Sequence, residues 1–242
     1  MVLLSYSCMG WGTRQKVLRV SSARREVPSY LLTQTDVADQ FQKNNKLDWM
    51  HWIIPNALED KDAMTTAWYQ PTAFSPFPSD RPELEEAEDE VGLLESVKYV
   101  ESLIDACVAK GIPPQRIVLG GFSQGCALSL LTDLTSSKYA GRLAGIVGLM
   151  GYVPLDKRVQ HLRAHADLPV THGDVPIFMA RGQNDKLVPK RIHSQTLKAL
   201  EMLGATGVES HEYEGLGHSL SGPVLKDMCA FLERVVPDLG DF

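Results

Sequence analysis

The stretch "IVLGGFSQGCALSLL", residues 117–131, joins a short apolar run to a helix-like pattern through two glycines, a serine and a third glycine. Residues 121–125 have the spacing Gly-x-Ser-x-Gly, which holds a serine on a sharp strand-to-helix turn with its hydroxyl exposed above the sheet. The glycines leave out Cβ atoms that would crowd such a turn. An ordinary loop with a serine helix cap is the alternative. Because the strand, the turn and the helix are all present, the sequence predicts a nucleophile at Ser123.

Short apolar runs alternate with helical patterns along the chain. The predicted strands are residues 2–6, 49–54, 117–120, 145–150, 176–180 and 208–213. The predicted helices are residues 36–44, 93–110, 125–132, 190–203 and 224–235. This alternation predicts an α/β fold with a mainly parallel sheet and helices on both faces. Since no repeat or long linker interrupts it, we expect a single domain over residues 1–242.

Composition argues against several classes of function. The net charge of −6 disfavours a nucleic-acid partner, and no apolar run reaches the roughly 20 residues of a membrane span. The cysteines lie far apart without paired or metal-ligand spacing, which favours a reducing, cytoplasmic location. They are Cys8, Cys107, Cys126 and Cys229. We expect no metal, no cofactor, no transmembrane segment, and a monomer or weak dimer.

The first 25 residues carry five basic side chains and no acid before Glu26. That composition resembles an organelle transit peptide. The alternative is that residues 2–6 form the first buried strand and the basic stretch is a solvated loop. We favour the strand because the fold needs those residues in its sheet.

A serine hydroxyl is a poor nucleophile near neutral pH, so a base must accept its proton and an acid must orient that base. With this strand-turn-helix motif, the acid and then the histidine follow the serine in the chain. Asp185 leaves the strand 176–180 on the serine's side of the sheet, whereas Asp174 enters it. Among seven histidines, His218 alone follows the last strand, in the loop "EGLGHSL". The sequence therefore predicts a triad of Ser123, Asp185 and His218.

Two backbone donors are expected to stabilise the oxyanion. One is the N–H after the nucleophile, at Gln124. The second should come from a loop behind an early strand, and Trp11 in "MGWGT", residues 9–13, is the candidate because its flanking glycines let the backbone approach. An ordinary Gly-x-Gly turn is the alternative.

Aromatic residues gather in the proline-broken loop "WYQPTAFSPFPSDRP", residues 68–82. Trp68, Tyr69 and Phe74 either pack onto the sheet edge or form an apolar substrate-binding wall, and the sequence leaves both open. The acidic residues 83–90 that follow are expected to open the long helix, where they complement its positive end.

These residues resemble the acyl-protein thioesterase and small carboxylesterase group of α/β-hydrolases, especially its fungal members. The likeness runs from about Trp49 to the C-terminus through "IIPNA", "AWY", "GIPPQRIVLGGFSQGCALSL", "GQNDKLVP" and "YEGLGHS". The resemblance implies an α/β-hydrolase fold, the triad named above and a Gln124 oxyanion donor. It also implies acyl ester or thioester substrates, including lipidated cysteine on proteins, with broad carboxylesterase or lysophospholipase activity as the wider class.

The chain departs from that family near its start. Where the family has a His-Gly-x-Gly-Asp loop, residues 9–13 are Met-Gly-Trp-Gly-Thr, and the divergent residues 1–35 match the pattern poorly. Arg181 stands where histidine is common, and we expect little effect from it. The competing hypothesis is a catalytically impaired hydrolase-fold protein that binds acyl chains. The complete Ser, Asp and His set argues against it.

Overall fold

A five-stranded sheet forms the centre of the computed structural model, which describes residues 2–4, 34–57, 59–60, 65–70, 74 and 87–240. The strands are β1 Val2–Leu4, β4 Val118–Phe122, β5 Gly145–Leu149, β6 Ile177–Gly182 and β7 Val208–Tyr213. They lie in the order β1-β4-β5-β6-β7, and every neighbouring pair is parallel. The predicted parallel α/β architecture is confirmed.

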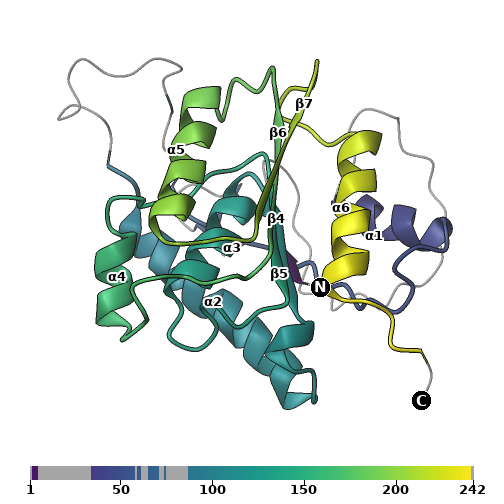
Figure 1. Ribbon diagram of the computed structural model, residues 1–242, viewed down its shortest axis with the longest axis horizontal. Coiled ribbons are helices and arrows are strands. Elements are labelled where there is room, and N and C mark those ends of the chain that lie inside the picture. The colour runs from purple at the N-terminus through teal and green to yellow at the C-terminus, as the bar shows by residue number, and fades with distance from the viewer. Residues whose placement is uncertain are drawn as a thin grey trace.

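Helices cover both faces of this sheet (Figure 1). One face carries α1 Gln34–Lys43 and α6 Gly222–Val235. The other carries α2 Glu90–Ala109, α3 Gln124–Thr135, α4 Val159–His165 and α5 Lys190–Met202. None of the helices in the described ranges has the length and apolar character needed to cross a membrane.

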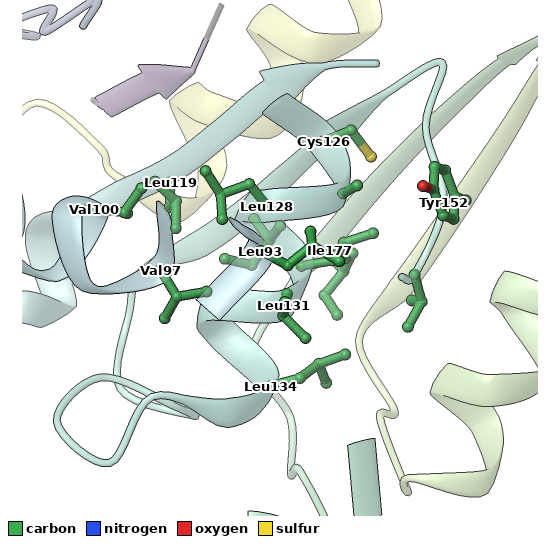
Figure 2. Packing of buried hydrophobic residues seen from close by; sticks show 14 of the residues in the cluster. Leu93, Val97, Val100, Leu119, Cys126, Leu128, Leu131, Leu134, Tyr152 and Ile177 are labelled. Carbon is green, nitrogen blue, oxygen red and sulfur yellow. The ribbon is translucent and has the colours of Figure 1, made fainter. Parts of the chain in front are cut away.

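Alternate residues of β4, β5 and β6 feed two separate cores, as the period of a strand requires. Leu119 of β4 packs in the core beneath α2 and α3, whereas its neighbour Val118 packs beneath α1 and α6. Figure 2 shows the first core, where Leu93 and Val97 of α2 meet leucines of α3 above the strands. β4, β5 and β6 therefore read as nearly continuous apolar runs because both of their faces are buried.

The sheet register brings the carboxyl ends of the strands to one edge. Phe122 pairs with Leu149, and Gly182 pairs with Tyr213. At the other side of β4, Leu4 lies opposite Gly121, so the chain leaves β1 beside the turn that follows β4. Loops after these strands consequently meet at the edge where ligand sites form in open α/β sheets.

One predicted strand is wrong. Residues 49–54 contain only a single β-bridge, at Ile53. Side-chain contacts hold this segment in place of backbone strand pairing. Trp52 stacks on Phe41 of α1 with ring centroids 5.8 Å apart, and the Trp49 indole N–H donates to the Val236 carbonyl at 3.0 Å. The aromatic and branched side chains that suggested a strand serve the core beneath α1 and α6.

Four short elements of the described residues were not predicted: helix α4, the turn of 3₁₀ helix at Pro114–Arg116, and the antiparallel strands β2 Glu59–Asp60 and β3 Thr65–Thr66. Helix α2 begins at Glu90, and the Asp89 side chain caps it by accepting from the Gly92 N–H at 2.9 Å. The expected acidic start is thus confirmed for these two positions, while residues 81–86 lie outside the described residues.

Candidate active site

Ser123 lies on a sharp turn between β4 and α3. Its backbone has φ 55° and ψ −116°, a conformation that costs a non-glycine residue free energy and that clusters at functional sites. Gly121 makes the turn possible, because a Cβ atom there would lie 2.2 Å from the carbonyl carbon of Gly125. Ser123 and Phe122 are half-buried in this turn, whereas Gly121, Gln124 and Gly125 are buried.

The turn is anchored to the next strand. The Ser123 N–H donates to the Leu149 carbonyl at 2.8 Å, and a Cβ atom at Gly151 would lie 2.8 Å from the Ser123 carbonyl oxygen. Gln124 is the first residue of α3, where a backbone N–H has no partner one turn earlier in the helix. Its N–H therefore lies at the helix N-terminus, beside the serine, as an oxyanion donor must.

Asp185 follows β6 in a tight turn. Its Oδ1 atom accepts from the N–H groups of Leu187 and Val188, each at 2.9 Å, and its own N–H donates to the Gly182 carbonyl at 3.1 Å. The residue is 5% exposed, so these bonds fix the carboxylate in a low-dielectric environment. Its Oδ2 atom remains for a partner.

His218 supplies that partner. Its Nδ1 atom lies 2.8 Å from Oδ2 of Asp185, and its ring meets the Phe122 ring edge-on with centroids 4.9 Å apart. The histidine is thus next to the residue that precedes Ser123. Because the carboxylate only accepts, Nδ1 carries the proton, and Nε2 is left as the basic nitrogen.

This arrangement has the parts needed for nucleophilic catalysis. A hydroxyl sits on a half-buried turn at a helix N-terminus, and an imidazole held by a buried carboxylate lies beside that turn. The set can accept the serine's proton, stabilise the resulting imidazolium and return the proton to a leaving group. Across the described residues, no group of three or more His, Cys, Asp or Glu side chains is placed to bind a metal.

A cysteine lies directly behind the serine. Cys126 is fully buried in the first turns of α3, and burial raises the pKa of its thiol to about 12. A protonated thiol is a weak nucleophile, so Cys126 does not compete with Ser123.

The predicted aromatic residues lie close to the turn. Trp68 is 1% exposed and packs in the core against Tyr99 of α2, Tyr69 is buried, and Phe74 is half-buried. These positions agree with packing for Trp68, while substrate contact by the three side chains stays a prediction. Trp11, the predicted second oxyanion donor, lies outside the described residues.

Sequence reasoning did not identify Tyr152 and Glu88, which lie beside the aromatic residue Tyr69. The Tyr152 hydroxyl lies 3.1 Å from that of Tyr69, and Glu88 accepts from the Leu155 N–H at 2.7 Å. Burial raises the pKa of Glu88, and it raises that of Tyr152 far above the ordinary value for tyrosine. Tyr152 follows β5 at the same sheet edge as Ser123, so the rule that sites form at strand ends was the signal for it.

Comparison with known proteins adds independent findings. The model of a family described as phospholipase/carboxylesterase matches residues 33–236. Acyl-protein thioesterase 1 of Yarrowia lipolytica is 34% identical over 206 residues, covering 84% of this chain and 85% of the relative. Acyl-protein thioesterase 1 of Cryptococcus neoformans is 36% identical over 194 residues, covering 75% and 78%. The crystal structure of SOBER1 from Arabidopsis thaliana superposes with a TM-score of 0.66 at 28% identity, covering 83% and 90%.

Proposed function

This chain belongs to the phospholipase/carboxylesterase family of hydrolases, and from that premise we propose that it is a serine hydrolase that removes acyl groups from protein cysteines. The observation that carries the proposal is the 2.8 Å bond from His218 to Asp185 beside the Ser123 turn. The names of the two fungal relatives support a thioester substrate. Three buried free cysteines, Cys107, Cys126 and Cys229, support a reducing location such as the cytoplasm.

The reaction begins when the Ser123 Oγ atom attacks the carbonyl carbon of the acyl group. His218 Nε2 takes the hydroxyl proton, and Asp185 stabilises the imidazolium through the Nδ1–H bond. The negative charge that develops on the carbonyl oxygen is stabilised by the Gln124 N–H and a second donor, which we assign to Trp11.

The tetrahedral intermediate then collapses. The bond from carbon to sulfur breaks, His218 returns its proton to the leaving thiolate, and the acyl group stays on Ser123 as an ester. Water enters, gives a proton to His218 and attacks the ester carbonyl, and the carboxylic acid leaves as the proton returns to Ser123 Oγ. The same steps cleave an oxygen ester.

Hydrolysis by the purified chain tests this proposal. We expect turnover of an S-palmitoyl cysteine peptide and of p-nitrophenyl acyl esters, together with covalent labelling by a fluorophosphonate. Ser123→Ala should abolish turnover and labelling, because the nucleophile is lost. Ser137→Ala, a change at an exposed serine beyond the end of α3, is the matched control and should keep both.

Two outcomes contradict the proposal. Labelling that persists in Ser123→Ala would place the nucleophile elsewhere. Acyl-chain binding without turnover or labelling by the folded native chain would favour a non-catalytic binding protein.

A further inference from the structure

The segment Trp68–Gln70 is held in place by side chains of α2 and α3. The Trp68 N–H donates to Oε1 of Gln124 at 3.2 Å, and Nε2 of Gln124 donates to the Tyr69 carbonyl at 2.9 Å. The Ser96 hydroxyl donates to the Trp68 carbonyl, and the Gln70 N–H donates to Oδ2 of Asp89 at 2.9 Å. Four backbone groups of this segment therefore depend on helix side chains for their hydrogen bonds.

Gln124 lies closer to the proposed nucleophile than Ser96 and Asp89, the other two residues whose side chains bind this segment. It directly follows Ser123, it is only 5% exposed, and its backbone N–H is the proposed oxyanion donor. Its side-chain amide accepts a hydrogen bond from one N–H of the segment and donates one to a carbonyl of the segment, as the backbone of a neighbouring strand would do. Buried amides of this kind are costly to leave unpaired, so these two hydrogen bonds tie the segment to the N-terminus of α3.

Tyr69 of this segment belongs to an aromatic cluster with Phe74 and with Tyr152, which follows β5. The two tyrosine hydroxyls are 3.1 Å apart, and the Phe74 ring meets the Tyr152 ring edge-on with centroids 4.6 Å apart. Gly151, the residue before Tyr152, packs against the Ser123 carbonyl oxygen. The cluster is thus fixed to the serine turn from two sides, through Gln124 and through Gly151.

We infer that the Gln124 side chain is a positioning residue that sets the distance between the aromatic cluster and the oxyanion donor, and so determines which acyl chain lengths are hydrolysed efficiently. The inference rests on the proposed function, which makes this sheet edge the acyl-binding side. The two roles of Gln124 are separable, because the backbone N–H acts on the reacting oxygen while the side chain acts on the segment Trp68–Gln70.

A pair of substitutions separates positioning from general damage. Gln124→Met keeps the volume and the backbone N–H but removes both side-chain hydrogen bonds. Ser96→Ala removes a different bond to the same segment without altering the serine turn. Gln160→Met, at an exposed position of α4, is the matched control.

The measurement is kcat/KM for p-nitrophenyl acetate, octanoate and dodecanoate, with melting temperatures for every variant. We expect Gln124→Met to lower the ratio of long-chain to acetate kcat/KM by about tenfold, within the range that misfit of an apolar pocket produces. Ser96→Ala should shift the ratio in the same direction and by less. The double variant should show less than the sum of the two effects, because both release one segment.

Three results would overturn the inference. An equal loss at all chain lengths in Gln124→Met would mean that only the oxyanion donor was disturbed. Native kcat/KM at all chain lengths in Gln124→Met would show that the side chain has no positioning role. If Gln124→Met does not fold, an unchanged ratio of long-chain to acetate kcat/KM in Ser96→Ala would overturn the inference. Ser123→Ala is assayed in parallel, so retained hydrolysis there would count against the proposed function instead.

Discussion

Gly182 lies directly against the backbone of Gly217: a Cβ atom at position 182 would be 2.3 Å from the Gly217 carbonyl oxygen. Gly182 ends β6 three residues before Asp185, and Gly217 immediately precedes His218. The contact therefore joins the two loops that carry the acid and the base. Only a residue without a side chain allows the loops to approach so closely.

Replacing Gly182 by alanine should separate these loops. We expect Gly182→Ala to lower kcat at least tenfold, because the hydrogen bond between His218 and Asp185 lengthens, and to destabilise the fold by about 1–3 kcal/mol through overpacking. Ester hydrolysis and urea unfolding measure the two effects. Gly222→Ala is the control, since a Cβ atom there meets open space, and an equal loss of kcat in both variants would contradict the argument.

The two aspartates that flank β6 give a second prediction. Asp185→Asn should lower kcat by about 10⁴-fold, because an amide at this position no longer holds the histidine in its catalytic tautomer. Asp174→Asn, at the exposed and opposite end of the strand, should leave kcat nearly unchanged. Steady-state kinetics decide the matter. Similar losses in the two variants would reject the choice of acid made from strand direction.

Strand direction was the strongest guide in the sequence, since it places Asp185, and not Asp174, at the end of β6 that faces the Ser123 edge. The strands β4 to β6 were predictable because they are buried on both sides and read as apolar runs, whereas the edge strand β7, with the sequence VESHEY, is only partly buried. The same signal failed for residues 49–54, where the aromatic side chains pack beneath α1 and α6 and the backbone makes a single bridge. Apolar runs alone do not distinguish pairing from packing.

Helix α4 was missed for a different reason. One of its two buried residues is Arg163, so it lacks an apolar stripe. The Arg163 guanidinium donates to the carbonyls of Leu134, Pro169 and Thr171 at 2.6–2.9 Å, so tertiary hydrogen bonds that the periodicity of the sequence does not reveal hold this helix. The cluster of Tyr69, Phe74 and Tyr152 was only partly predicted for the same reason, because tertiary packing brings its members together.

A third prediction concerns the stability of the fold at acid pH. His193 is 2% exposed in α5 and hydrogen-bonds Ser210 at 2.9 Å. Burial, reinforced by the nearby Arg181, lowers its pKa from 6.5 to about 4. The unfolded chain therefore binds a proton that the folded chain does not. The stability that comes from keeping this histidine neutral is present above about pH 6.5 and is lost as the pH falls through about 4.

His193→Gln removes the titrating group and keeps a hydrogen-bonding atom near Ser210. Between pH 6.5 and 4, the unfolding free energy of the variant should depend less steeply on pH than that of the native chain, by up to about 1.4 kcal/mol per pH unit. Urea unfolding across this range gives the slopes. Parallel curves for native and His193→Gln proteins would show that this histidine does not contribute.

The last prediction addresses the second oxyanion donor. Leu4 pairs with Gly121, so β1 ends at the same sheet edge as Ser123. If the Trp11 N–H is the donor, Trp11→Leu should retain most activity because the amide remains. Trp11→Pro removes the N–H, and loss of one such donor costs on the order of 10²–10³ in kcat with a much smaller change in KM. Circular dichroism and melting must first show that the proline variant is folded, because proline also restricts the loop. A folded Trp11→Pro enzyme with near-native kcat would place the donor elsewhere, and the loop after β1 would then have no direct part in catalysis.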